Sequence, residues 1–262
     1  MTLDDATVTR IAATLDDAAM AVTQTPKITL EFPELRIEDA YRIQRANIAR
    51  RLSRGETLVG MKMGLTSLAK MEQMGVHDPI YGHLTNTMLR GDGDPIVRSE
   101  HGQPRVEPEV AFLLDKDLSG RVTPAEAMQA VGGVCAAIEV IDSRFAKFQF
   151  TLIDVVADNA SSTRFFLGST VRPPSEVDLG NLGMVLRRNG RIEKVGSSAA
   201  ILEHPARSLA RLSIMLDAVG EGLRAGQIVL AGGATAAIHV DAGDHIRLDV
   251  DGLGSVETSV IA

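Results

Sequence analysis

The stretch RVEPEVAF, from Arg105 to Phe112, places two glutamates one residue apart in a run that otherwise has the composition of a β-strand. Successive side chains of a strand point to opposite faces, so Glu107 and Glu109 share one face. The other face carries Val106, Pro108, Val110 and Phe112. Two neighbouring carboxylates repel each other, and each resists leaving water. The pair therefore indicates either a solvated strand face or part of a cation site.

A third acid occurs in the next apolar run. Glu139 is the only charged residue between Val131 and Ile141. Burying a lone acid in an apolar strand is costly unless the acid is paired or binds a metal. Divalent cations take oxygen ligands, and three carboxylates leave about half of an octahedral magnesium shell open to water or substrate. The pattern alone leaves the metal site and the solvated face both open.

Lys62 lies in VGMKMGLTS, residues 59–67, which also alternates like a strand. It shares a face with Gly60 and Gly64, and these glycines leave room for a ligand to approach the ammonium group. The alternative is an edge-strand lysine in water. Helix signals follow directly, with Gly75 as the expected end of that helix.

Two further stretches are rich in residues that bind ligands or form turns. VVADNASSTRF, residues 155–165, contains Asp158, Asn159, Ser161, Ser162 and Arg164. LAGGATAA, residues 230–237, contains two glycines and Thr235; it permits close backbone approach but lacks the spacing of a phosphate or dinucleotide loop. A loop that satisfies its own backbone is the alternative for residues 155–165, and each of the two signals is weak alone.

DKDLSGRVTPAE, residues 115–126, fits the pattern of a calcium loop. An EF-hand needs a helix on both sides, whereas a predicted strand precedes this stretch. Thr123, Pro124 and Glu126 have a local explanation, because together they form a capping box with proline in the first helical turn. We therefore interpret the stretch as a turn followed by a helix.

Composition limits the classes of function. The chain has 262 residues, is 45% hydrophobic and carries a formal net charge of -7 without a basic cluster, so neither nucleic acid nor a membrane surface is an expected partner. The single cysteine, Cys135, lies in an apolar run and is interpreted as a core residue. The acidic N-terminus does not resemble a signal peptide, and a cytoplasmic protein is expected.

The order of predicted elements divides the chain into a helical N-terminal region, residues 1–56, and a β-rich body, residues 57–262. The first helix has an apolar stripe made of Val8, Ile11, Leu15, Ala18 and Val22. Asn189 and Gly190 predict a β-hairpin between two alternating runs. A long helix is expected from His204 to Val219, with Pro205 at its start and Gly220 after its end. The expected fold class is α+β.

Taken together, the motifs resemble the fumarylacetoacetate hydrolase superfamily. Their order is KMGLTS, EPE, IEVIDSR, VADNASS and GLGSV, and the resemblance covers essentially the whole chain. Within the superfamily, the sequence is similar to the hydratase and decarboxylase branch of aromatic meta-cleavage pathways. The resemblance implies a mixed β-roll core and a magnesium or manganese ion. It also implies Glu107, Glu109 and Glu139 as metal ligands, and Lys62 as an active-site residue. A desolvated lysine close to a cation is expected to have a lowered pKa.

The resemblance further implies a small 2-oxo dicarboxylic acid as substrate. The expected reaction is decarboxylation of (3E)-2-oxohex-3-enedioate to 2-hydroxypenta-2,4-dienoate, with a companion hydratase bound to this protein. Hydration of the pentadienoate is the alternative, and a metal-binding scaffold without activity is a third. DPIYG, residues 78–82, favours the decarboxylase, because Ile80 replaces an acid of the hydratases.

The expected substrate-binding residues include an apolar pair, hydroxyl groups and one cation: Leu65, Ile80, Ser161, Ser162, Arg164 and Thr235. Arg144 is a second possible carboxylate clamp. Asp142 lies close enough in sequence to make Arg144 a structural ion pair instead, and both alternatives are open.

Overall fold

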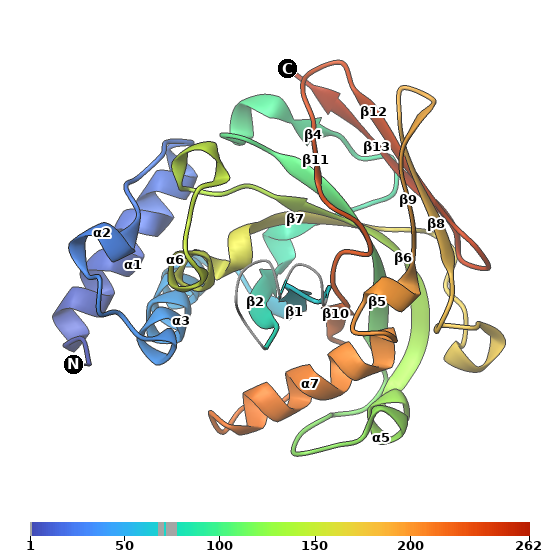
Figure 1. Cartoon of the computed structure of the whole chain (residues 1–262), viewed down its shortest axis with the longest axis horizontal. Helices are drawn as coiled ribbons and strands as arrows, with labels where there is room; N and C mark the ends of the chain where they lie inside the picture. Colours follow the sequence, from blue (N-terminus) through green and yellow to red (C-terminus); the bar gives the residue numbers. More distant parts are fainter. Residues whose placement is uncertain (1, 68–70, 72–77) are drawn as a thin grey trace.

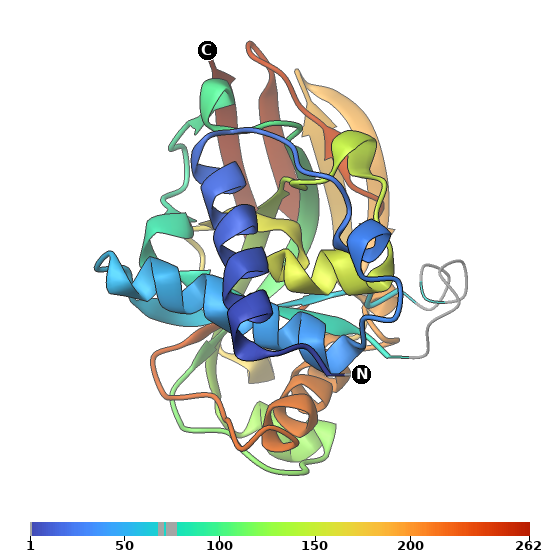
Figure 2. The same cartoon turned by 90° about the vertical axis from the view of Figure 1, so that its left-hand side faces the viewer.

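The computed structural model describes residues 2–67, 71 and 78–262, so most of the helix expected to end at Gly75 lies outside the described residues. The chain opens with three helices, α1 (Asp5–Met20), α2 (Ile28–Glu31) and α3 (Ile37–Ser53). The Asp4 side chain caps α1 by accepting a hydrogen bond from the Thr7 N–H at 2.7 Å. Four residues of the predicted stripe are buried: Val8, Ile11, Leu15 and Ala18. Figure 2 shows α1 crossing α3 on this side of the molecule.

The central sheet has the order β2-β1-β10-β5-β6-β7-β3 in the described part of the chain, with β11 paired to β5. Its strands are β1 (Leu58–Gly64), β2 (Ile80–Thr85), β3 (Leu89–Arg90), β5 (Arg105–Leu114), β6 (Val131–Ile141), β7 (Ser162–Leu167), β10 (Ile228–Leu230) and β11 (Ile238–His239). The longest strands, β5 and β6, are antiparallel neighbours at its centre (Figure 1). The stretch RVEPEVAF therefore forms the middle of the sheet.

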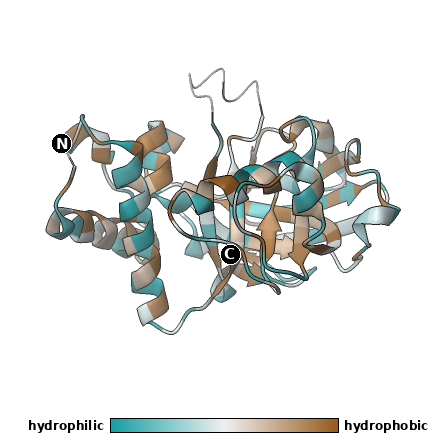
Figure 3. Ribbon diagram, turned by 90° about the horizontal axis from the view of Figure 1, so that it is seen from below, coloured by the Kyte–Doolittle hydropathy of each residue, from teal (hydrophilic) through white to brown (hydrophobic). Residues whose placement is uncertain are grey.

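A second sheet has the order β4-β13-β12-β8-β9. Its strands are β4 (Ile96–Val97), β8 (Gly183–Arg188), β9 (Arg191–Ser197), β12 (His245–Val250) and β13 (Gly254–Ile261). Asn189 and Gly190 have φ values of 53° and 78°, which confirms the predicted hairpin between β8 and β9. The largest apolar core lies between the two sheets, and Figure 3 shows hydrophobic residues concentrated along the strands.

Further helices in the described part of the chain are α5 (Pro124–Met128), α6 (Leu152–Ala157) and α7 (Pro205–Asp217). Thr123 and Glu126 form the expected capping box of α5, and β5 precedes the turn, so the calcium-loop pattern does not form an EF-hand. The helix α7 ends at Asp217, before the expected end at Val219, which is 45% exposed. Short 3-10 segments occur at Asn86–Met88, Arg98–Glu100, Ala146–Phe148, Asn159–Ser161, Pro174–Glu176 and Ser198–Ala200.

The N-terminal helices pack on the sheet through α6, which the sequence did not reveal as a helix. A second apolar core joins α1 and α3 to α6, and it includes Phe145 and Val156. Figure 1 shows these helices together on one side, with β8, β9, β12 and β13 on the other. The arrangement confirms the α+β class, while the division at residue 56 stays a prediction.

Two smaller expectations concern the core and the membrane. Cys135 is fully buried, and burial raises the pKa of its thiol to about 12, which confirms a core residue rather than a nucleophile. Among the described residues, no helix is both long enough and apolar enough to cross a membrane.

Candidate active site

The three predicted acids converge on one face of the central sheet. Glu107 of β5 lies directly opposite Glu139 of β6, and Glu109 lies opposite Ala137. One carboxylate oxygen from each glutamate lies within 4.8 Å of one oxygen of each of the others. Val106, Val110 and Phe112 are fully buried on the other face, as the alternation predicted. The solvated-face alternative is wrong for Glu109 and Glu139, because neither is exposed to solvent.

The environment of these acids fits a cation. One oxygen of Glu109 accepts a hydrogen bond from the Gly232 N–H at 2.7 Å, while its buried Oε1 has no hydrogen-bond partner in the described structure. Burial, together with the charges of Glu139 and Glu107, raises the pKa of Glu109 well above its usual value, although Lys62 opposes the shift. A divalent ion would offset the repulsion between the carboxylates and would give Glu109 Oε1 a partner. The residues present therefore fit such an ion.

Lys62 belongs to the same cluster. Its Nζ lies 2.8 Å from Glu139 Oε2 and donates a hydrogen bond to the Ala160 carbonyl oxygen at 3.3 Å. The residue is only 2% exposed, so the edge-strand alternative is wrong. Burial by itself would lower the pKa of the ammonium group, but Glu139, Glu109 and Glu107 outweigh it and raise the pKa. The expected lowering assumed a neighbouring cation, whereas three carboxylates surround the ammonium group here.

Of the two glycines beside Lys62, Gly60 has a different role from the one expected. A Cβ on Gly60 would lie 1.9 Å from the Ile228 carbonyl oxygen, so this glycine permits the close approach of β10. A Cβ on Gly64 would lie 3.1 Å from the Ile80 side chain and 3.8 Å from Lys62 Nζ. The room near the ammonium group therefore comes from Gly64.

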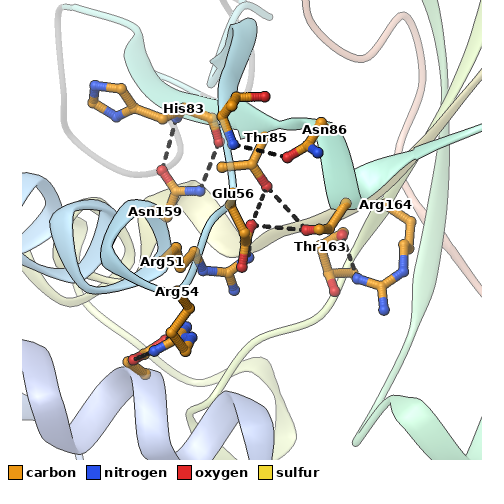
Figure 4. Close-up of polar contacts among 12 residues, drawn as sticks. Arg51, Arg54, Glu56, His83, Thr85, Asn86, Asn159, Thr163 and Arg164 are labelled. Carbon is orange, nitrogen blue, oxygen red and sulfur yellow. Dashed lines mark hydrogen bonds and ion pairs between the residues drawn. The ribbon is translucent and has the colours of Figure 1, made fainter.

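The VADNASS stretch forms the wall beside Lys62. Asn159, Ala160 and Ser161 have φ values of 50°, 52° and 59°, a run of left-handed conformations that non-glycine residues rarely adopt. Figure 4 shows how the loop is held, because the Asn159 amide accepts from the His83 N–H at 2.8 Å and donates to the His83 carbonyl at 2.9 Å. Ser162 Oγ then donates to Glu139 Oε1 at 2.9 Å. The loop thereby contacts both Lys62 and a predicted metal ligand.

Ser161 and the apolar candidates lie near these groups. The buried Ser161 hydroxyl has no hydrogen-bond partner in the described part of the chain. Leu65 follows β1 directly with a φ of 55°, and Ile80 is paired with Gly64. Thr235 follows Gly233, at which a Cβ would lie 3.0 Å from the Glu107 carboxylate. The glycine loop thus approaches the acids closely, as its composition suggested.

Neither arginine considered as a clamp joins the cluster. Arg144 is buried and its Nε lies 2.5 Å from Asp158 Oδ1, so it is a structural pair. Its partner is not Asp142, whose carboxylate accepts from the Gly102 and Gln103 N–H groups. Arg164 is paired with Val140 across β6 and β7, and therefore lies on the face opposite Glu139. Its guanidinium binds Glu100 at 3.0 Å, and Figure 4 shows it beside Thr163, away from the Asn159–His83 pair.

Two supporting residues were not predicted. Gln44 of α3 donates to the carbonyl oxygens of Tyr81 and Val156, and its own oxygen lies 3.1 Å from His83 Nδ1. Burial lowers the pKa of His83 to about 4, so its ring is neutral at pH 7. The sequence signal for Gln44 is its position in α3 between the apolar Ile43 and Ile48.

The fold and this site define an enzyme class. The chain matches the family described as fumarylacetoacetate (FAA) hydrolase C-terminal over residues 59–261, and it belongs to that family. It is 46% identical over 252 residues to a 4-oxalocrotonate decarboxylase from a Pseudomonas species, an alignment that covers 96% of this chain and 97% of the relative. The expected family and its decarboxylase and hydratase branch are thereby confirmed.

Two further relatives are a decarboxylase of known structure and a hydratase. The structure of 4-oxalocrotonate decarboxylase from Pseudomonas putida G7, complexed with magnesium and adipate, matches with a TM-score of 0.97, 41% identity and 99% coverage of both chains. A 2-keto-4-pentenoate hydratase from Paraburkholderia xenovorans is 40% identical over 228 residues, which are 87% of this chain and 85% of the relative. Both alternatives drawn from the sequence are therefore represented among its relatives.

Proposed function

We propose that this chain is a metal-dependent decarboxylase that converts (3E)-2-oxohex-3-enedioate to 2-hydroxypenta-2,4-dienoate and carbon dioxide. The observation that carries the proposal is the convergence of Glu107, Glu109 and Glu139 beside the buried Lys62. The similarity to 4-oxalocrotonate decarboxylases over nearly the whole chain supports the same reaction. The metal is a divalent ion, and magnesium is the first choice because a relative was crystallised with it.

The reaction moves electrons from one end of the substrate to the other. When the bond between C5 and the C6 carboxylate breaks, its electron pair forms a C4–C5 double bond, the original C3–C4 double bond shifts to C2–C3, and the C2 keto oxygen becomes negative. A divalent ion held by the three glutamates would supply Lewis-acid stabilisation of that charge. A proton on the oxygen then gives the dienol product.

Lys62 is the proton donor in this scheme, or the positive charge that pairs with a substrate carboxylate. In the metal-free protein the three carboxylates raise the pKa of Lys62, and Glu139 and the Ala160 carbonyl orient its Nζ. Ser162 fixes Glu139 from the other side. Leu65, Ile80, Ser161 and Thr235 are kept as proposed substrate contacts, whereas the position of Arg164 argues against that role.

Hydration of 2-hydroxypenta-2,4-dienoate is the second candidate, since hydratases are also relatives. The DPIYG stretch argues against it. Ile80 is apolar and 4% exposed, and Asp78 pairs with Arg211 at 2.5 Å. Neither side chain is therefore placed to direct a water molecule in the described structure.

The test is to supply each substrate separately to purified protein loaded with magnesium or manganese. We expect carbon dioxide from the hexenedioate and little conversion of the pentadienoate. Efficient hydration without decarboxylation would reverse the assignment. Inactivity towards both would favour the scaffold.

Three finer proposals accompany this assignment: a place in an aromatic meta-cleavage pathway, a cytoplasmic location and a companion hydratase. A companion hydratase is expected to bind this protein and take up the unstable dienol. Co-purification of a hydratase encoded by the same organism, checked by mass spectrometry of the complex, tests that partner.

A further inference from the structure

The site as described lacks a group for the second carboxylate of a dicarboxylic acid. Lys62 is already paired with Glu139 at 2.8 Å. Arg144 and Arg164 have carboxylate partners of their own at 2.5 and 3.0 Å. Among the described residues, a cation without a carboxylate partner that could serve the distal carboxylate is therefore to be found beyond these three.

Arg105 is placed for this purpose. It precedes Glu107 by two residues in β5, so it extends the same face of the strand towards the half-exposed end of the cluster. Two residues along a strand span about 6.8 Å, a distance comparable with the length of a six-carbon chain. Among the described residues, the half-buried Arg105 side chain makes neither an ion pair nor a hydrogen bond.

The guanidinium of Arg105 is nevertheless held in place. Its carbon atom lies 4.0 Å from the centroid of the Phe148 ring. Lys147 and Phe148 have φ values of 58° and 55°, conformations that persist only where the surrounding structure enforces them. The Gln103 amide fastens this loop to the start of β5 by donating to the carbonyl oxygens of Ser143 and Phe145. Stacking on an aromatic face leaves the in-plane N–H groups of an arginine available for a carboxylate.

We propose that Arg105 forms a carboxylate subsite at the rim of the active site and binds the distal carboxylate of a dicarboxylic 2-oxo acid. Phe148 is the platform that orients its guanidinium. The inference rests on the proposed function, and it assigns the specificity for dicarboxylic over monocarboxylic 2-oxo acids to one residue. Because the distal carboxylate becomes neutral carbon dioxide, Arg105 contributes to substrate binding rather than to bond cleavage.

The test compares two stable ligands that share the 2-oxo acid group, 2-oxoadipate and 2-oxohexanoate. Their dissociation constants are measured by calorimetry with magnesium-loaded protein, so no turnover is required. The wild type is expected to bind 2-oxoadipate about tenfold more tightly. Arg105→Gln should lose this preference by weakening the dicarboxylate alone, whereas Arg105→Lys should keep part of it. Lys147→Gln is the matched control, because it removes an exposed cation from the same loop and should keep the preference.

An unchanged preference in Arg105→Gln, an equal weakening of both ligands, or loss of the preference in Lys147→Gln would overturn the subsite. In turnover, Arg105→Gln should raise KM for the hexenedioate about tenfold without lowering kcat. A protein that shows the Arg105-dependent preference but releases no carbon dioxide would overturn the proposed reaction and leave the subsite intact.

Discussion

Two buried ion pairs, Arg144–Asp158 and Lys62–Glu139, lie close together and differ in how completely they are hydrogen-bonded. Asp158 accepts from both the backbone N–H and the Nε of Arg144, and its own carbonyl accepts from the same guanidinium. Lys62 and Glu139 instead adjoin Glu109, whose Oε1 has no partner in the described structure. We call the first pair saturated, because its buried polar atoms are hydrogen-bonded, and such a pair stabilises the fold. The second cluster is unsaturated, because a buried oxygen is left that can bind a ligand.

The largest expected effect is on the unsaturated cluster. Glu139→Gln should abolish magnesium binding or reduce activity by about three orders of magnitude, because it removes a ligand without changing the shape of the side chain. Calorimetry with magnesium and a decarboxylation assay measure both quantities. Turnover that persists in excess chelator would contradict the metal site.

Disrupting the saturated Arg144–Asp158 pair should lower the stability of the protein rather than its affinity for a ligand. Arg144→Met leaves the buried Asp158 carboxylate without its partner and should lower the free energy of unfolding by about 3–5 kcal/mol. Denaturant unfolding measures the loss. Glu109→Gln is the contrasting variant, and it should stabilise the metal-free protein because a buried charge is removed. If both variants destabilise equally, the distinction between the two pairs fails.

Lys62→Met tests the cation of the cluster. Turnover should fall about 100-fold through loss of a proton donor or a charge, while magnesium affinity stays nearly intact. Steady-state kinetics at saturating magnesium and a separate metal titration distinguish these effects. Near-normal turnover would exclude Lys62 from the reaction.

The smallest effect is a dependence on pH. Burial raises the pKa of Glu109 above 4.5, so its contribution to the stability of the metal-free fold is most favourable below that value and is lost as the pH rises through the raised pKa. Magnesium requires the ionised form, so its affinity should change in the opposite direction and increase about tenfold across the same window. Calorimetry in buffers of different ionisation enthalpy should show proton release. Affinity that is independent of pH would contradict the raised pKa.

Local sequence determined the main features of the active site. The period of two in β5 placed Glu107 and Glu109 on one face, and the apolar run around Glu139 marked it as a buried acid. The Asn189–Gly190 hairpin and most of α7 followed from turn and capping residues in the same way. These features depend on residues that are close together in the sequence, so the sequence alone is enough to predict them.

Only the tertiary structure decided which partners distant groups take. Arg144 binds Asp158 rather than the nearer Asp142, and Gly60 accommodates the backbone of β10, which follows it by more than 160 residues. The left-handed run at residues 159–161 depends on the backbone of His83. Arg105 meets Phe148 because the start of β5 and the loop after β6 lie at the same rim. Such contacts join segments that only the folded sheets bring together, so no local pattern could specify them.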